Sequence, residues 1–512
     1  MINVTGNSLT LDELVMVARR GREVSPSAQT LDRLESSRAA VERVVETNVP
    51  AYGINTGFGT LCDTAIRPDQ LSLLQENLVR SHAVGAGSPL GEDAVRAAML
   101  LRLNSLCRGY SGVRPEVTRL LADMLNRKVH PRVYSQGSLG ASGDLAPLAH
   151  LALVMIGEGE ALYQGELLPG REALRRAGLC PLQLEAKEGL ALLNGTAFLA
   201  GIGALACWDA LNLLEMAGIA AVLSLEALGG LSDAYRPELI AVRPHLGSVL
   251  VSGHLRALLA QRAPGSPARK KIQDPYSFRC VPQVHGAALD AVVHARRVLE
   301  VELNSTTDNP LILDGCIVSG GNFHGQPVGA VMDYLGIALA ALAGISERRA
   351  DHLLDPALSG LPPFLVSDSG LNSGWMIAQY TAASLVNENR VLAAPASVHS
   401  IPVSANQEDY VSMATLASRK ASDIVANTQV VLAIELLVAA QALDMKFEQG
   451  SLSREELGKG GRAAYAVVRE RVPYLDQDRY LYPDVVTVTG LVRDGTLLDA
   501  VRKEVGPLSV PN

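Results

Sequence analysis

The sequence predicts an all-α fold, in which a long helical bundle follows a loop-rich N-terminal part and the only β-structure is small β-hairpins. The composition favours helices, because Ala and Leu dominate the 512 residues and Phe, Trp and Tyr together make up 4%. Apolar residues also repeat at spacings of three and four over residues 200–227, 283–304, 326–354, 373–392 and 411–445. Each stretch exceeds the ~11–12 residues of an average globular helix, which indicates a long bundle.

The N-terminal part is predicted to begin with a small hairpin over residues 2–9, turning at Gly6-Asn7. Thr10 and Glu13 have the spacing of a capping box, so a helix is expected to run from there to about residue 20. Further helices are expected over residues 30–47, 71–83 and 92–106. The glycine-rich stretches are predicted to be loops, and they cover residues 50–62 and 134–143.

The chain is too long for one simple core, so more than one domain is expected. Loop-rich sequence gives way to long helical periods near residue 200. We therefore predict an N-terminal domain of residues 1–200, and a second domain of residues 201–512 that holds the bundle and the C-terminal helices. A hairpin with the turn Asp314-Gly315 is predicted to interrupt the bundle.

Charge and cysteine usage exclude several function classes. The net charge is −8, from 45 basic and 53 acidic residues, and no basic cluster stands out, so nucleic acid is not an expected partner. The ten His are scattered without a metal-binding spacing, which predicts no metal site. Six Cys without a CxxC motif read as reduced thiols of a cytoplasmic protein. The first 20 residues lack a signal peptide, and no run reaches the ~18 uninterrupted apolar residues of a membrane span.

The tripeptide Ala141-Ser142-Gly143 has a latent chemistry. If the backbone bends sharply, the Gly143 amide nitrogen can attack the Ala141 carbonyl, and loss of water closes a five-membered ring. Loss of the Ser142 hydroxyl as a second water leaves an exocyclic methylidene. The product, 4-methylidene-imidazol-5-one (MIO), is an electrophile that no ordinary side chain supplies. Gly143 suits the strained geometry because it has no Cβ. The alternative is an ordinary loop, with Asp144 capping the helix that follows it.

Around this tripeptide the sequence resembles the aromatic amino acid ammonia-lyase family, nearly from end to end. The matching segments are Tyr52–Gly59, Asn77–His82, Gly137–Pro147, Glu188–Thr196, Gln273–Gly286, Thr307–Pro310, Gly321–His324, Ser346–Arg349 and Ser404–Asp409. The resemblance implies an all-helical homotetramer whose active sites each draw on three chains. It also implies that MIO forms autocatalytically from Ala141-Ser142-Gly143, with no metal and no external cofactor.

The same resemblance assigns the acid–base chemistry and the binding of the substrate carboxylate. Tyr52 is implied as the base that removes the β-proton, for which its pKa would have to be lowered. Arg279 is implied to bind the carboxylate through a bidentate fork, a geometry that Lys cannot offer. From the residues alone, Tyr52 could instead be a loop residue packed on Phe58, and Arg279 a partner in a surface salt bridge.

Four more residues match family positions around the substrate. Asn194 resembles the Asn beside the electrophile, able to hydrogen-bond its carbonyl or the substrate, although Asn194-Gly195 could also be a simple turn. Gln273 and Tyr276 match positions near substrate and electrophile, and Phe323 matches an aromatic wall position.

Two positions match the histidine-specific branch of the family. His82, in the pair Ser81-His82, and Glu408 are expected to face the substrate ring, His82 as a donor and Glu408 as the acceptor for an imidazole N–H. The sequence thus predicts elimination of ammonia from L-histidine to give urocanate.

Three residues depart from the usual pattern of that branch: Ala197 stands in place of Gln, His399 in place of Asp and Tyr410 in place of His. A tyrosine or phenylalanine ammonia-lyase, or a tyrosine 2,3-aminomutase with the same electrophile, therefore remains an alternative. A catalytically silent helical scaffold is a more distant one, because it would be marked by the loss of Tyr52, Ser142 or Arg279.

Overall fold

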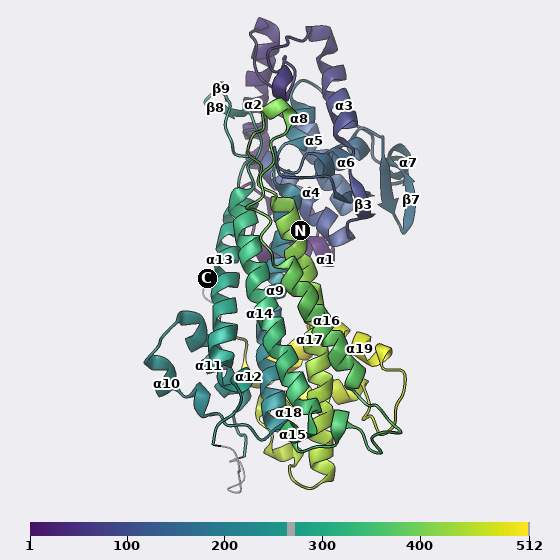
Figure 1. Ribbon diagram of the computed structural model, residues 1–512. Coiled ribbons are helices and arrows are strands. Elements are labelled where there is room, and N and C mark those ends of the chain that lie inside the picture. Colours follow the sequence, from purple (N-terminus) through teal and green to yellow (C-terminus); the bar gives the residue numbers. More distant parts are fainter. Residues whose placement is uncertain (264–271, 510–512) are drawn as a thin grey trace. The chain divides into compact units, whose positions relative to one another are not determined.

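The computed structural model describes residues 1–263 and 272–509 (Figure 1). The predicted all-α class is confirmed: helices dominate, and the strands described are short. The chain divides into two compact units. Unit 1 comprises Met1–Trp208, Ala295–Asp333 and Pro395–Ser422, and unit 2 comprises Asp209–His294, Tyr334–Ala394 and Asp423–Asn512. The predicted domain boundary near residue 200 stays a prediction.

Five long helices match the five stretches of helical periodicity. They are α9 (Ala197–Ala227), α13 (Val281–Leu303), α14 (Gln326–Leu354), α16 (Met376–Leu392) and α17 (Ala414–Glu448). α9 and α14 are long and apolar enough to cross a membrane by length and composition alone. In α9, however, 78% of the most apolar window is buried inside the protein, as in the core helix of a globular fold.

The remaining elements of unit 1 are helices of at most 20 residues and short strands. Its helices are α1 (Leu11–Arg20), α2 (Ala28–Thr47), α3 (Leu71–His82), α4 (Glu92–Leu106), α5 (Pro115–Asn126), α6 (Ala146–Met155), α7 (Gly170–Arg176) and α8 (Glu188–Leu193), with 3-10 turns at Gly59–Leu61, Pro68–Gln70 and Ser404–Asn406. Its strands are β1 (Ile2–Val4), β2 (Val24–Pro26), β3 (Ala86–Pro89), β4 (His130–Pro131), β5 (Tyr134–Gln136), β6 (Glu160–Tyr163), β7 (Glu166–Pro169), β8 (Leu311–Leu313) and β9 (Cys316–Val318). The sheets pair β3 with β5, β8 with β9, and β6 with both β4 and β7.

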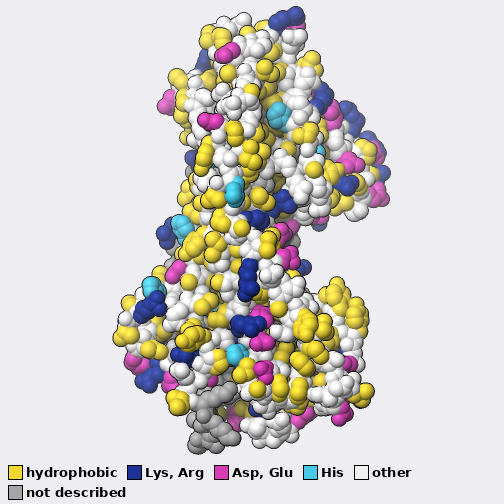
Figure 2. Space-filling model, viewed as in Figure 1, with side chains coloured by type: hydrophobic (Ala, Val, Ile, Leu, Met, Phe, Trp, Pro, Cys, Tyr) yellow, Lys and Arg dark blue, Asp and Glu magenta, His cyan; other side chains and the backbone are white. Residues whose placement is uncertain are grey.

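The other helices of unit 2 are also short. They are α10 (Pro237–Ala241), α11 (Leu246–Leu258), α12 (Tyr276–Arg279), α15 (Pro356–Ser359), α18 (Lys459–Arg471), α19 (Tyr482–Asp494) and α20 (Thr496–Val505), with 3-10 turns at Asp233–Tyr235, Pro363–Leu365 and Arg454–Glu456. Figure 2 shows Lys and Arg side chains scattered among acidic and apolar ones on the face that is drawn, as the mild net charge implies.

Local signals predicted two features correctly. The Thr10 hydroxyl accepts from the Glu13 amide at 3.2 Å, and the Glu13 carboxylate accepts from the Thr10 amide at 3.0 Å, so the capping box of α1 is confirmed. The hairpin β8–β9 is also confirmed. Asp314 and Gly315 both have positive φ, of 49° and 77°, as a two-residue hairpin turn requires.

The hairpin predicted over residues 2–9 is wrong. β1 pairs in parallel with β2, with Ile2 opposite Val24 and Val4 opposite Pro26. The Gly6 amide donates to the Asn104 side chain at 3.0 Å, so the turn at Gly6 directs the chain into α1 rather than back along β1. The partner strand arrives only after α1.

Candidate active site

The tripeptide Ala141-Ser142-Gly143 lies in the loop between β5 and α6 and pairs with Gly195, the second residue after α8. The Gly195 amide donates to the Ser142 carbonyl at 3.3 Å, and the Asp144 amide donates to the Gly195 carbonyl at 2.7 Å. Gly143 has a φ of 75°, and a Cβ there would overlap the Gly195 carbonyl. Only glycine fits this position, which is the one that would supply the attacking nitrogen.

The two groups that would react to close the ring take no part in this pairing. The bridge uses the amides of Gly195 and Asp144, and no hydrogen bond in the described part of the chain engages the Gly143 amide or the Ala141 carbonyl. The bent backbone, the glycine and the free reacting groups together fit the formation of MIO from these residues.

Asp144 does not cap the helix that follows it. Its carboxylate accepts from the Phe198 amide at 2.5 Å and from the Leu199 amide at 3.0 Å, both in the first turn of α9. The pKa of Asp144 is raised to about 7, because the effect of burial outweighs the lowering by these two amides. The alternative considered from the sequence, in which Asp144 caps the helix directly after it, is therefore wrong, because Asp144 caps α9 instead of α6. Asp144 fastens the tripeptide to a helix that begins more than 50 residues later in the chain.

A second segment, residues 404–413, is held against the same loop. The Met413 amide donates to the Leu139 carbonyl at 3.0 Å, and the Ser412 hydroxyl donates to the Gly140 carbonyl at 3.3 Å. This brings Glu408 to Ser142: burial raises the pKa of Glu408, while a hydrogen bond with the Ser142 side chain lowers it.

Tyr52 lies in the same unit, on a loop anchored by the fully buried Ile54 in a cluster with α2 and α3 residues. Its phenol oxygen accepts from the Gly59 amide at 3.4 Å. Burial raises the pKa of Tyr52, and the negative charge of Glu408 raises it further, while the Gly59 amide lowers it. Within one chain the pKa of Tyr52 is thus raised, opposite to the lowering that a base requires. A base role needs a further positive charge or donor.

Asn194 caps the C-terminal end of α8 beside the tripeptide. Its side-chain amide donates to the Ser142 carbonyl at 3.3 Å, so this carbonyl receives two donors, from Asn194 and Gly195. The buried Asn194 Oδ1 has no hydrogen-bond partner among the described residues. An acceptor in this state is available to a substrate ammonium group.

His82 ends α3 with its ring held by backbone. His82 Nδ1 lies 2.9 Å from the Leu78 carbonyl, so Nδ1 carries the proton and donates. Burial lowers the pKa of His82, which favours the neutral ring. In that tautomer Nε2 is an acceptor, not the donor expected from the sequence.

Phe323 sits in a turn at residues 321–324 that contacts the Glu408 segment. The adjacent His324 ring lies 3.2 Å from the Tyr410 carbonyl through Nε2 and stacks on the Tyr410 ring, with centroids 6.0 Å apart. Tyr410 is one of the three residues that depart from the usual histidine-specific pattern. The other two lie elsewhere in the structure. Ala197 is a buried residue at the start of α9, and His399 is exposed in a turn.

The structure brings Tyr52, Ser142, Asn194 and Glu408 together in unit 1, with His82 and Phe323 in the same unit. Gln273, Tyr276 and Arg279 belong instead to unit 2. Tyr276 and Gln273 are exposed, and the Arg279 guanidinium lies 4.7 Å from the centre of the Tyr276 ring.

Arg279 is oriented without the surface salt bridge considered from the sequence. Its Nε donates to the Asp274 carbonyl at 2.6 Å, and no carboxylate pairs with it in the described part of the chain. Its short helix, α12, is held from behind: the Ser277 carbonyl accepts from Arg349 at 3.4 Å and the Phe278 carbonyl from Tyr235 at 2.9 Å. The terminal N–H groups of Arg279 remain available for a ligand carboxylate.

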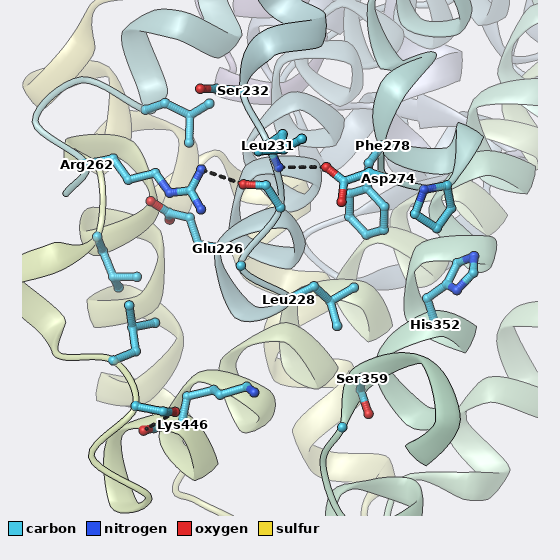
Figure 3. Close-up of a pocket in the computed structure, with 18 of the residues that line it drawn as sticks. Glu226, Leu228, Leu231, Ser232, Arg262, Asp274, Phe278, His352, Ser359 and Lys446 are labelled. Atoms are coloured by element: carbon cyan, nitrogen blue, oxygen red, sulfur yellow. Dashed lines mark hydrogen bonds between the residues drawn. The ribbon is translucent and has the colours of Figure 1, made fainter. Parts of the chain in front are cut away.

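A pocket of about 1120 Å³ lies within unit 2, beside α12 (Figure 3). Its lining includes Asp274, whose carboxylate accepts from the Leu231 amide at 2.6 Å, and Phe278 and His352. None of the residues predicted for the active site lines it. We assign the chemistry to the tripeptide loop because the bent backbone and the unbonded Gly143 amide and Ala141 carbonyl lie there.

Three buried charged residues behind Asn194 were not singled out from the sequence. They are Arg102 on α4, Lys187 before α8 and Asp308, each 1% exposed or less. A charged residue inside an apolar helical stretch, such as Arg102 in residues 97–106, was the available signal, since charges are rarely buried without a partner.

Comparison with known proteins agrees with this assignment. A model of the family described as aromatic amino acid lyase matches residues 9–470. The histidine ammonia-lyase of Clostridium tetani is 48% identical over 506 residues, 98% of each chain. The crystal structure of histidine ammonia-lyase from Trypanosoma cruzi has a TM-score of 0.91 at 40% identity, covering 100% of this chain and 98% of the other. The tyrosine aminomutase structure from Streptomyces globisporus has a TM-score of 0.93 at 37% identity, covering 100% of both chains. With a family match over most of its length and a tripeptide poised for cyclisation, this chain belongs to the aromatic amino acid lyase family and is a carbon–nitrogen lyase.

Proposed function

We propose that the protein eliminates ammonia from L-histidine to give urocanate, with an MIO electrophile formed from Ala141-Ser142-Gly143. The observation that carries the proposal is the pairing of the tripeptide with Gly195, which bends the backbone and leaves the Gly143 amide and the Ala141 carbonyl unbonded. MIO supplies an electron-poor carbon that makes removal of the amine or of the β-proton easier. The relatives named histidine ammonia-lyase support histidine as the substrate.

Residues around the tripeptide remove the β-proton, bind the substrate ammonium and stabilise negative charge. Tyr52 takes the β-proton, and the free Oδ1 of Asn194 accepts from the substrate ammonium. Asn194 Nδ2 and the Gly195 amide hold the Ser142 carbonyl, where negative charge can be stabilised. Glu408 lies next to both Tyr52 and Ser142, so its charge state influences each of them.

Two polar side chains, His82 and Glu408, recognise the substrate ring. Neutral His82 presents Nε2 as an acceptor for the imidazole N–H, because its Nδ1–H is engaged by Leu78. The Glu408 carboxylate accepts from the second N–H that a protonated substrate imidazole carries, and burial raises the pKa of Glu408. Glu408 keeps the acceptor role that the sequence suggested, whereas His82 changes from donor to acceptor.

We further propose a cytoplasmic homotetramer, in which Gln273, Tyr276 and Arg279 of one chain complete a site that other chains begin. Two observations support shared sites. The pKa of Tyr52 is raised within a single chain, and Tyr276 is 71% exposed beside an Arg279 that has no carboxylate partner among the described residues.

Arg279→Lys is expected to lower kcat/KM by roughly ten- to a hundred-fold, because one charge-assisted hydrogen bond is worth about 1.5–3 kcal/mol. The ammonium keeps the charge but loses the fork, so KM should account for most of the change. Steady-state kinetics with histidine measure the effect. Arg236→Lys, at a surface salt bridge in the same unit, is the matched control and should change neither constant. Unchanged kinetics for Arg279→Lys would assign the carboxylate to another cation.

The substrate assignment is tested by ultraviolet assays with histidine, tyrosine and phenylalanine offered separately. Leaving His82 and Glu408 unpaired against a phenyl ring costs about 1–3 kcal/mol each, so histidine should be preferred over phenylalanine by roughly a hundred-fold or more. His82→Leu combined with Glu408→Gln should erode histidine activity and raise phenylalanine activity relative to it.

The alternative substrate is tyrosine, which Tyr410 and the similarity to a tyrosine aminomutase structure favour. Faster turnover of tyrosine than of histidine by the wild type would reject histidine as the substrate. Retention of the amino group in a β-amino acid product would then identify an aminomutase rather than a lyase.

A further inference from the structure

A buried charge cluster lies directly behind the electrophile loop. Arg102 donates to the Asn194 carbonyl at 2.6 Å and to the Ser105 hydroxyl at 3.2 Å. A second nitrogen of Arg102 lies 4.0 Å from the Asp308 carboxylate, which also accepts from Lys187 at 3.3 Å and from Ser111 at 3.0 Å. The two cations and the carboxylate are 1% exposed or less.

This cluster holds α8 at both ends. Lys187 immediately precedes α8, and Asn194 immediately follows it. Asp308 binds Lys187 directly, and through its neighbour Arg102 it is linked to the Asn194 carbonyl. The position of Asn194 relative to α4 is therefore set by a buried ionic framework rather than by the turn alone.

The link from Arg102 to the tripeptide passes through one peptide group. The carbonyl of Asn194, which accepts from Arg102, and the amide of Gly195, which donates to the Ser142 carbonyl at 3.3 Å, belong to the same planar unit. Fixing the oxygen fixes the direction of the N–H. A cation on the oxygen also polarises the group and strengthens the N–H as a donor.

Gly195 leaves no room for an alternative arrangement. Its φ is 139°, and a Cβ there would approach the Arg102 guanidinium and the Thr307 side chain closely. The Thr196 amide also donates to the Thr307 hydroxyl at 3.3 Å, so the next peptide group, Gly195–Thr196, is held as well.

We propose that Arg102 is a positioning residue for formation of the electrophile: it fixes the Asn194–Gly195 peptide plane, which in turn holds the Ser142 carbonyl while the ring closes. The proposal rests on the proposed function, since ring closure in Ala141-Ser142-Gly143 is part of it. The hydrogen bonds of the fold do not use the whole guanidinium. Arg102 Nε has no partner among the described residues, and a buried charge with an unsatisfied N–H is costly compared with an apolar side chain.

The reaction that Arg102 assists needs no further reagent. The Gly143 nitrogen bonds to the Ala141 carbonyl carbon. The Ala141 oxygen leaves as water with the amide hydrogens of Gly143 and Ser142, which creates a carbon–nitrogen double bond. The Ser142 hydroxyl then leaves as a second water with the Ser142 α-hydrogen, which creates the methylidene. The chain loses two waters and is neither oxidised nor reduced.

The test follows the intact mass of the full chain at fixed times after synthesis in a cell-free system. Wild-type protein is expected to reach a mass two waters below the encoded value. Arg102→Met should slow this loss of water by roughly ten-fold or more, because a charge-assisted hydrogen bond is removed from the peptide that holds Ser142. Arg102→Lys, which keeps the charge but cannot serve Asn194 and Ser105 at once, should be slowed to a smaller extent.

The matched control is Arg96→Met, on the same helix. Arg96 is also buried and donates to the carbonyls of Val17, Ala18 and Leu125, none of which touches the tripeptide. This variant should lower the melting temperature but lose two waters at the wild-type rate.

Folding of each variant is checked by circular dichroism and thermal melting. A folded Arg102→Met protein that loses both waters at the wild-type rate would overturn the proposal. If Arg102→Met does not fold, a wild-type rate for Arg102→Lys overturns it and a slowed rate supports it. A wild-type mass equal to the encoded one would instead reject the proposed function.

Discussion

Ser142→Ala is expected to lower activity by several orders of magnitude while the fold is kept. The substitution removes the hydroxyl that leaves as the second water, so the methylidene cannot form even if the ring closes. The side chain is only partly buried and its hydroxyl contacts Glu408, so little packing is lost. Activity with histidine, intact mass and thermal melting should be measured on the same preparation.

Ser138→Ala is the control for this experiment. Its hydroxyl lies in the same loop and donates to the Gly143 carbonyl at 3.4 Å, but it belongs to no bond that breaks. Ser138→Ala should still lose two waters, whereas Ser142→Ala should retain at least one. Full activity in a wild-type protein whose mass equals the encoded one would exclude the electrophile altogether.

The parts of the fold that the sequence predicted are those determined by neighbouring residues. The long helices follow from an apolar period that continues for several turns, and the capping box of Thr10 and Glu13 needs only residues three apart. The pair Asp314-Gly315 favours the positive φ angles that a two-residue hairpin turn needs. The position of the tripeptide in a sharply bent loop was predictable from its glycines for the same reason.

The features that sequence analysis missed depend on residues far apart in the chain. β1 pairs with a strand that follows α1, and Asp144 caps α9 rather than the adjacent α6. The cluster of Arg102, Lys187 and Asp308 brings together residues up to about 200 positions apart, and no spacing rule marks such a set. The acceptor state of His82 Nε2 was not expected from the sequence, because a local carbonyl, that of Leu78, fixes the tautomer.

Division of the site residues between the two units has a consequence for Tyr52. Ser142, Asn194 and Glu408 lie in unit 1 with Tyr52, where burial and the negative charge of Glu408 raise the pKa of Tyr52 instead of lowering it. For Tyr52 to act as the proposed base, a complete site must add a group that favours the phenolate. Arg279 and the substrate are candidates, and a tetramer is one way to bring them in.

Tyr52→Phe is expected to lower kcat by roughly 10²–10⁴-fold, the range for loss of a general base, with little effect on folding or on the loss of two waters. Among the described residues the phenol has one hydrogen bond, from the Gly59 amide, so the ring of Phe should fit the same space. Tyr163→Phe, in the β6–β7 hairpin of the same unit, is the control and should match the wild type. A Tyr52→Phe protein with wild-type kcat would require a different base.

The same variant tests whether the active site is shared between chains. Tyr52→Phe and Arg279→Met proteins should each be nearly inactive alone. After subunit exchange, a mixed assembly contains sites that take Tyr52 from one chain and Arg279 from another, so part of the activity should return. The mixing ratio should control the amount recovered, and native mass spectrometry should show that exchange has occurred. Proven exchange without any recovery would mean that Tyr52 and Arg279 act in one site of one chain, and the raised pKa of Tyr52 would then have to be overcome by the substrate alone.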